Sequence, residues 1–206
     1  MLVKTFSSSV TGIEAVIVTI EVNVSPGVRF FLVGLPDSTV KESQQRIESA
    51  FRSMNLRWPG KQVLINMAPA DIKKEGSAFD LPLAIGILAA NENVVMAELC
   101  DYVVMGELSL DGSLKPVKGV LPVALEARKK GFTKIIVPSS NALEAAVVEG
   151  LEVYGMEALR DVVDHLNGMK NFPPVSINVS DLFSLKANLY DCLLYTSDAA
   201  DDLQPV

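Results

Sequence analysis

The sequence predicts an α/β protein with two layers, in which helices pack against a β-sheet. Segments rich in β-branched residues alternate along the chain with segments whose apolar residues recur at helical spacing. Glycine, proline and aspartate lie at the junctions between these segments, where turns and helix ends favour them. The chain of 206 residues is long enough for one sizeable domain, or for one domain with an extension.

The first half of the domain is expected to contain four strands and two helices. Asp37 or Ser38 can cap the first helix, and Pro59 follows its end. Asp80 can cap the second helix, where Pro82 is tolerated in the first turn. The expected strands are 3–9, 15–24, 29–33 and 62–66, and the expected helices are 38–54 and 80–90.

The second half is expected to continue the same alternation. The turn at Asp111 and Gly112 joins a strand over 102–110 to a returning strand over 114–117, so this pair is predicted to form a hairpin. Gly119 opens a helix that ends in three cations before Gly131, which suits the negative end of a helix dipole. Strands at 134–137 and 151–154 and helices at 141–148 and 156–166 complete a domain that we place at residues 1–169.

Charge is distributed unevenly along the chain. The formal net charge is −7, yet residues 1–78 carry nine Lys/Arg against seven Asp/Glu and the remainder carries nine against eighteen. This balance argues against strong non-specific nucleic-acid binding by the whole chain, but it leaves room for a local basic face. The first residues lack a basic region followed by an apolar core, and there are two cysteines without metal-ligand spacing. We therefore expect a cytoplasmic protein without a membrane partner or a metal site.

Residues 66–83 are the most informative segment. A predicted strand ends here, a charged loop with a glycine follows, and an apolar helix begins. Loops that lead from a strand into a helix N-terminus expose free backbone N–H groups, which bind anions and support activated nucleophiles. The structural alternative is that Asp71, Gly76 and Asp80 only shape turns and helix ends, and we favour this alternative.

Several sequence blocks resemble one known family. They are Phe31-Leu-Val-Gly-Leu-Pro-Asp37, Asn66-Met-Ala-Pro-Ala-Asp71 with Lys74-Glu-Gly76, Asp80-Leu-Pro-Leu-Ala-Ile-Gly-Ile-Leu-Ala-Ala90, Gly106-Glu-Leu-Ser-Leu-Asp-Gly112 and Val137-Pro-Ser-Ser-Asn-Ala-Leu-Glu-Ala-Ala146. In this order they resemble the N-terminal region of the ComM/YifB family, the magnesium-chelatase-like AAA+ ATPases of bacteria. The resemblance implies the fold of ribosomal protein S5 domain 2, as in the Lon proteolytic domain and the RadA C-terminal domain.

The resemblance also implies a longer parent protein. Its AAA+ module would follow this domain, bind ATP and Mg, assemble as a homo-hexamer and act on DNA in branch migration and natural transformation. Residues 170–191 would then be a linker toward that module, and residues 192–206 a non-native or truncated tail. No Walker A pattern occurs in the sequence, because Gly60-Lys61 is followed by Gln62, so we expect no cofactor in this region itself.

A Lon-type peptidase needs a serine activated by a neutral, partly buried lysine. When Lys74-Glu75-Gly76 is aligned with the similar Lon motif, Ala78 takes the place of the nucleophile and apolar residues follow Gly119 where Lon has its lysine. The resemblance therefore implies a non-catalytic scaffold or interaction domain. The alternative is a substitute dyad of Ser77 and Lys118, one residue out of register. A free-standing nucleic-acid-binding module is a further alternative, by fold likeness alone.

Basic residues are the candidates for a nucleic-acid or subunit contact. They lie on the predicted first helix, between it and the next strand, and in the charged loop, and they are Lys41, Arg46, Arg52, Arg57, Lys61, Lys73 and Lys74. Four other features have a structural explanation that we prefer: His165 as a lone histidine, Glu107 beside a hairpin turn, Trp58 at a helix end, and the cations 128–130 at another.

Overall fold

The computed structural model describes residues 2–94 and 99–177. One compact unit extends through Val175 and contains all but the last two of them. We predicted a boundary at residue 169; the linker that we predicted lies only partly within the described residues, and the tail over 192–206 lies outside them.

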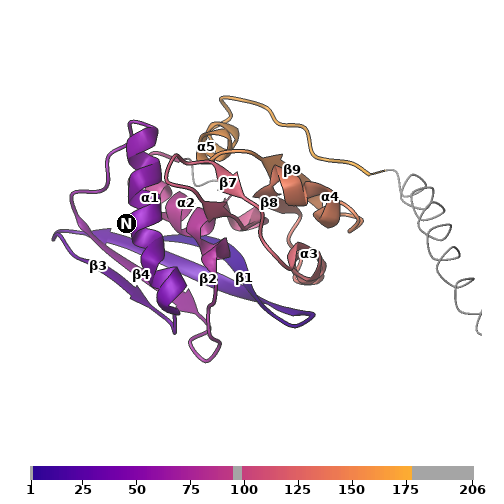
Figure 1. Ribbon diagram of the computed structural model, residues 1–206, viewed down its shortest axis with the longest axis horizontal. Coiled ribbons are helices and arrows are strands. Elements are labelled where there is room, and N and C mark those ends of the chain that lie inside the picture. The colour runs from indigo at the N-terminus through magenta and orange to yellow at the C-terminus, as the bar shows by residue number, and fades with distance from the viewer. Residues whose placement is uncertain (1, 95–98, 178–206) are drawn as a thin grey trace, which may run out of the picture. The chain divides into compact units, whose positions relative to one another are not determined.

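One large sheet organises the domain, in the order β3-β4-β2-β1-β5-β8-β9 (Figure 1). Among the described residues, four of its six strand pairings are parallel, and the two long antiparallel pairings hold β1 against β2 and β2 against β4. The strands are β1 (Leu2–Thr11), β2 (Glu14–Ser25), β3 (Phe30–Val33), β4 (Gln62–Ala68), β5 (Tyr102–Val104), β8 (Lys134–Pro138) and β9 (Glu152–Met156). This mixed α/β architecture confirms the predicted fold class.

Helices cover both faces of the sheet but not to the same extent. The helices are α1 (Ser38–Ser53), α2 (Asp80–Ala90), α3 (Val120–Lys129), α4 (Ala142–Ala145) and α5 (Leu159–Leu166). One apolar core lies between the first face and α1, α2 and α5, and it includes Val104. The second core lies between the other face and α3 and α4, and it includes Val103, because neighbouring residues on a strand point to opposite faces.

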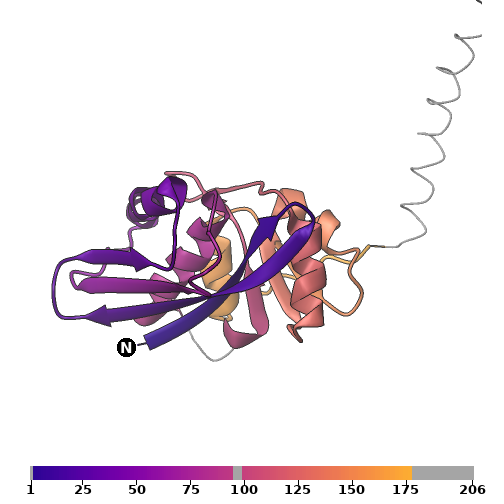
Figure 2. The ribbon, with the colours of Figure 1, turned by 90° about the horizontal axis from the view of Figure 1, so that it is seen from below.

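The two ends of the sheet therefore differ. Figure 1 and Figure 2 place α1 at the β3 end of the long strands and α3 at the other end. On the second face, the side chains of β3 and β4 belong to neither core among the described residues, and Phe31, Val33 and Leu64 stay exposed. Half of the sheet is thus covered on one face only.

Most helix and strand predictions hold within a few residues, and α2 begins and ends where it was predicted. Asp37 caps α1 as expected, since its carboxylate accepts the Val40 N–H at 2.7 Å. The prediction that Asp80 caps α2 was wrong. Phe79 holds the cap position, and a short 3-10 turn, Ser77–Phe79, precedes the helix.

The predicted strand over 102–110 was also wrong in extent. It divides into β5 and β6 (Glu107–Leu108), and β6 pairs with β7 (Leu114–Lys115) in a separate hairpin. The chain leaves the main sheet at Gly106, whose N–H donates to Ala78 O at 3.0 Å while its own carbonyl accepts from Leu81 N. A Cβ at Gly106 would lie 3.1 Å from carbons of Leu81 and Leu114, so the close packing there suits glycine. The division places Glu107 beside the 3-10 turn.

The last predicted helices are shorter than expected. A 3-10 turn at Ser139–Asn141 takes the start of the helix predicted over 141–148, leaving α4 at Ala142–Ala145. β9 extends to Met156, so α5 begins at Leu159 rather than at Met156. None of the helices in the described part of the chain is long and apolar enough to cross a membrane.

Candidate functional site

The charged loop is fixed in place by the segment that follows β3. Lys74 N donates to Leu35 O at 3.1 Å, and Asp37 N donates to Lys74 O at 3.0 Å. Asp37, the cap of α1, also accepts a long contact from Gly76 N at 3.4 Å. Gly76 has a φ of 84°, a left-handed value that glycine adopts without strain, as predicted for this position. Two of the sequence blocks that carry the resemblance are thus in direct contact.

A pocket of about 460 Å³ opens beside this loop. Its lining comes from the end of β1, the loop, the β6 strand and the segment before α3, and includes Ser8, Val10, Ser77, Ala78, Glu107, Lys118 and Gly119. Ser77 and Lys118 therefore line one cavity, although they are 41 positions apart in the sequence. Ala78, at the position of the Lon nucleophile, lines it as well.

Ser77 is engaged by a carboxylate. Its hydroxyl donates to Glu107 Oε2 across the pocket. Lys118 is exposed, whereas a lysine that acts as a general base must be desolvated to stay neutral. The pocket thus brings together a serine, a carboxylate and a solvated lysine. The pocket contains the residue types of a Ser–Lys site, but the serine hydroxyl donates its hydrogen bond to the Glu107 carboxylate.

Lys74 is buried, which contradicts its place among the candidate surface contacts. It has no exposed area, and its ammonium group donates to Pro69 O. Burial lowers the pKa of Lys74, because an apolar surrounding disfavours the charged form. Its neighbour Lys73 is exposed and forms an ion pair with Glu75 at 2.5 Å. Adjacent lysines in one loop therefore have different roles, and only Lys73 can contact a partner.

Arg46 is partly exposed, but its guanidinium is bonded to a buried carboxylate. Its guanidinium donates through Nε at 2.7 Å and Nη2 at 2.9 Å to the two oxygens of Asp80, which has no exposed area. The Asp80 carboxylate also accepts from Ser43 Oγ at 2.5 Å and from Leu108 N at 3.2 Å. The hydrogen bond to Asp80 raises the pKa of Arg46 above its ordinary value. This ion pair joins α1, α2 and β6 directly behind the pocket.

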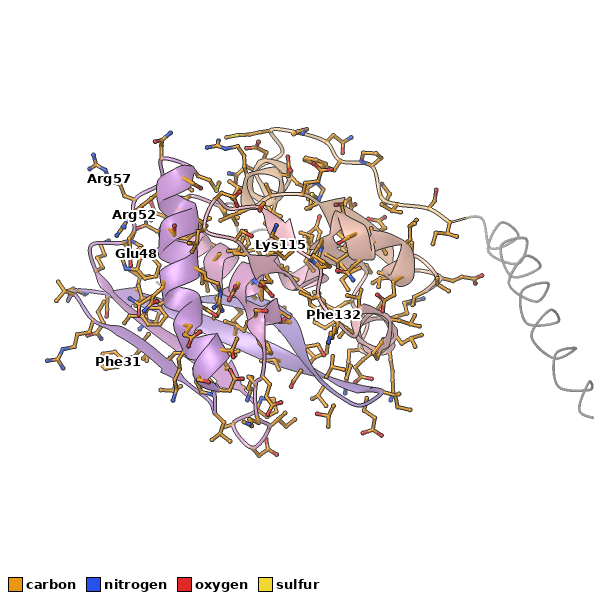
Figure 3. The ribbon with its side chains drawn as sticks, in the orientation of Figure 1. Phe31, Glu48, Arg52, Arg57, Lys115 and Phe132 are labelled. Atoms are coloured by element: carbon orange, nitrogen blue, oxygen red, sulfur yellow. The ribbon has the colours of Figure 1, made fainter. Side chains whose placement is uncertain are left out.

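The remaining basic candidates form two groups rather than one face. Arg52, Arg57 and Lys61 lie on the last turn of α1 and in the loop that follows it, and all three are exposed. Figure 3 shows Arg52 and Arg57 pointing outward from this end of α1. Lys41 and Lys73 lie at the other end of the helix, since the charged loop pairs with the residues before Asp37. Arg52 also forms an exposed ion pair with Glu48 at 2.7 Å.

Structural explanations account for the other candidates. Trp58 packs against Phe30 and Phe51, with ring centroids 5.8 and 5.9 Å away. His165 Nε2 lies 3.1 Å from the Tyr102 hydroxyl and packs on Tyr154, whose pKa burial raises to about 12. No group of three or more His, Cys, Asp or Glu within residues 2–94 and 99–177 could hold a metal ion.

Two side-chain interactions at the site were not predicted from the sequence. Glu107 was assigned to a turn, yet its carboxylate binds the Ser77 hydroxyl. The partnership of Arg46 with Asp80 was not expected either, because the residues are 34 positions apart and belong to two helices. One signal was present for Asp80, since it is the only charge in the otherwise apolar stretch from 80 to 90. A charge in a buried helix needs a partner.

The family is shown by comparison with known proteins. The profile of the family described as subunit ChlI of Mg-chelatase matches residues 20–141, more than half of the chain. Competence protein ComM of Haemophilus influenzae is 43% identical over 169 residues, covering 82% of this chain and 33% of that protein. The protein YifB of Escherichia coli is 40% identical over 158 residues, covering 76% of this chain and 31% of YifB. The chain belongs to the magnesium-chelatase-like ComM/YifB family and corresponds to its N-terminal domain.

A weaker similarity reaches the Lon proteases. Lon protease 2 of Bacillus subtilis is 26% identical over 132 residues, covering 63% of this chain and 23% of that protein. This match is consistent with the Lon-like fold of the domain. The chain spans about a third of the length of ComM and YifB.

Proposed function

We propose that this domain is a non-catalytic scaffold and interaction domain of a ComM-type AAA+ ATPase that acts on DNA. The observation that carries the proposal is the hydrogen bonding in the pocket. Ser77 donates to Glu107, Lys74 is used on a backbone carbonyl, and alanine occupies the Lon nucleophile position. The loops of the site then have a structural role, because they fix the start of α1 and α2.

The parent protein is part of the same proposal. Its AAA+ module would bind ATP and Mg, form a homo-hexamer and work on DNA in the cytoplasm, in branch migration or natural transformation. The relative named competence protein ComM supports a role connected with competence. A basic group at the end of α1 could contribute a DNA contact, and Arg52, Arg57 and Lys61 are its exposed members.

Direct DNA binding is tested by neutralising this group. A variant with Arg52, Arg57 and Lys61 changed to Gln is expected to bind single-stranded DNA more weakly than the unchanged chain in a retardation experiment. Binding by the unchanged chain should weaken as salt rises, because phosphate contacts release counterions. The matched control changes Arg128, Lys129 and Lys130 to Gln, which removes the same charge from the end of α3. Equal loss in both variants would show general electrostatic attraction instead of a site, and no retardation of the unchanged chain would remove the DNA contact from this domain.

A Ser–Lys peptidase is the second candidate, because Ser77 and Lys118 share one pocket. In this mechanism Lys118 would take the hydroxyl proton and Ser77 would attack a peptide carbonyl. It predicts turnover of casein that disappears both in Ser77→Ala and in Lys118→Met. Turnover that survives either change would come from a contaminant, and absence of turnover in the unchanged chain would leave the scaffold role.

A further inference from the structure

Two apolar patches stay exposed on the surface, at opposite ends of the sheet. The first, which we call the sheet patch, lies on the half of the second sheet face that no described helix covers. Its members are Leu2, Phe31, Val33 and Leu64. The second, the helix patch, lies on the solvent side of α3 and α4. Its members are Leu121, Leu125, Leu143 and Val147.

The sheet patch lies along one row of four strands, in which the polar Asn23 on β2 separates Leu2 from Leu64. Phe31 is paired with Leu64, Leu64 with Asn23, and Asn23 with Leu2, so these residues form one row on one face. Phe31 and Leu64 are 40% and 36% exposed. Figure 3 shows Phe31 at the β3 end of the sheet, pointing away from α1. Clustered apolar residues of this kind mark an interaction site more often than single exposed residues do.

The chemistry of the sheet patch fits a protein surface better than a nucleic acid. The next row of the same face contains Lys4 and Glu21, which form an ion pair at 3.2 Å, and Asn66, whose amide donates to Glu21 at 3.1 Å. The pair leaves no net charge among these residues to attract phosphate groups, and phosphate contacts dominate nucleic-acid affinity. Apolar residues beside a polar row without net charge resemble the core and rim of a protein interface, and the exposed Arg29 lies two residues before Phe31.

The helix patch repeats at helical spacing. Leu121 and Leu125 are four residues apart on α3, and Leu143 and Val147 are four residues apart on and just after α4, so each pair lies on one side. Leu125 and Leu143 are 54% and 64% exposed. The inner sides of the same helices, with Val120, Ala124 and Ala142, pack on the sheet. Both helices are therefore apolar on both sides, which an outermost layer does not require.

We propose that the sheet patch of one copy binds the helix patch of a second copy, head to tail. The inference rests on the proposed scaffold function and names the surfaces through which it acts. On the second face, α3 and α4 cover one half of the sheet and leave the other half without a helical layer. The α3 and α4 helices of a neighbour supply that missing layer and bury their own outer apolar side.

The described part of the chain ends at the edge of the sheet opposite to the sheet patch. Val175 N donates to Val153 O at 2.7 Å, so the described chain ends beside β9. β9 is the edge of the sheet opposite to β3, with five strands between them. At a strand spacing of about 4.8 Å, the two edges are roughly 29 Å apart. Since the two patches are different surfaces, their contact is heterologous, and repeated contacts form a ring or a filament.

The test uses two uncharged double variants of the 206-residue chain. Phe31→Thr with Leu64→Thr removes the sheet patch and keeps strand propensity, and Leu125→Gln with Leu143→Gln removes the helix patch and keeps helix propensity. The matched control, Leu110→Gln with Met169→Gln, changes two residues that are exposed outside both patches. Circular dichroism and thermal unfolding check that all variants fold. Sedimentation velocity up to about millimolar concentration measures association.

The expected result is reversible association of the unchanged chain and of the control, with association of each double variant weakened on the order of a hundredfold. The decisive sample is an equimolar mixture of the two double variants. Head-to-tail binding predicts a one-to-one dimer that grows no further, because each variant still carries one intact patch. A mixture that stays monomeric while the unchanged chain associates would overturn the pairing and leave the scaffold role standing. A monomeric unchanged chain would overturn the head-to-tail contact, and the scaffold role would then rest on contacts with other partners.

Discussion

Arg46 and Arg52 lie on the same helix and both face a carboxylate. Their ion pairs are expected to contribute differently to the free energy of unfolding, because the surroundings of the two pairs differ. Asp80 is fully buried, and Arg46 supplies two of its hydrogen bonds. Glu48, the partner of Arg52, lies at the surface, where water and salt screen the pair. A buried charge that loses its partner keeps its desolvation cost, whereas an exposed one is solvated again.

We therefore expect Arg46→Met to lower the free energy of unfolding by about 3–5 kcal/mol. Arg52→Met should change it by less than about 1 kcal/mol. Urea denaturation followed by circular dichroism measures both changes, and Arg52→Met is the control for loss of an arginine from α1. Equal effects of the two substitutions would show that the Arg46–Asp80 pair contributes no more than a surface ion pair.

Lys74 gives a prediction about pH. Burial lowers its pKa in the folded protein from the ordinary value of 10.5. Below the folded pKa both states bind the proton, and the cost of burying the charge is constant. Between the folded pKa and 10.5 the unfolded chain binds more protons, so the folded protein gains stability as pH rises through that window.

The difference in unfolding free energy between the unchanged chain and Lys74→Met should therefore move in favour of the unchanged chain as pH rises from the lowered pKa of folded Lys74 toward 10.5. At neutral pH the substitution should cost or gain less than about 2 kcal/mol, because it removes both a buried charge and its hydrogen bond to Pro69 O. Thermal or urea unfolding at several pH values measures the difference. A difference that stays constant across this range would mean that Lys74 keeps an ordinary pKa.

At the scale of elements, α2 is the centre of the fold. Every residue from Asp80 to Ala90 is buried, and the helix packs against β1, β2 and α1. Gly86 allows the closest approach, since a Cβ there would lie 2.7 Å from Val22 Cγ2 and 3.6 Å from Thr5. The glycine costs helix propensity but lets the helix sit directly on the sheet.

Gly86→Ala should therefore destabilise the protein by about 1–3 kcal/mol through overpacking, although alanine favours helix by about 1 kcal/mol. Gly60→Ala is the matched control, because a Cβ at Gly60 meets no atom within 4 Å and its φ is not positive. The control should stay within about 0.5 kcal/mol of the unchanged chain. If Gly86→Ala were the more stable protein, the packing of α2 on β2 would have room for a methyl group.

Elements with strong local signals could be predicted from the sequence. The long strands, α1 with its Asp37 cap, and the apolar run of α2 follow from periodicity and capping. The break at Gly106 could not, because it depends on hydrogen bonds to Ala78 and Leu81, which belong to a distant segment. The sequence offered Ser77 and Lys118 only as an alternative pair, and their shared pocket and the partnership of Ser77 with Glu107 required the structure.

At the scale of the whole molecule, the domain combines a buried centre, formed by α2 and the Arg46–Asp80 pair, with exposed apolar residues at its surface. The Arg46–Asp80 pair and α2 fix the pocket from behind, and the pocket loops fix the start of α1. The basic candidates are divided between two ends of α1, and Arg46 and Lys74 are bonded to groups within the domain. The apolar patches at opposite ends of the sheet are left as the larger surfaces for assembly. This arrangement is consistent with the proposed scaffold role.

The central claim is that Ser77 is not a nucleophile. Incubation of the 206-residue chain with a fluorophosphonate probe, followed by intact-mass and peptide mass spectrometry, tests it most directly. A known serine peptidase in the same reaction shows that the probe is active, and Ser77→Ala shows which adduct belongs to this residue. Because the Ser77 hydroxyl donates a hydrogen bond to Glu107, Lys118 in the pocket is exposed and the buried Lys74 donates to Pro69 O, we predict no adduct at Ser77. A stoichiometric adduct that is present in the unchanged chain and absent from Ser77→Ala would contradict the account.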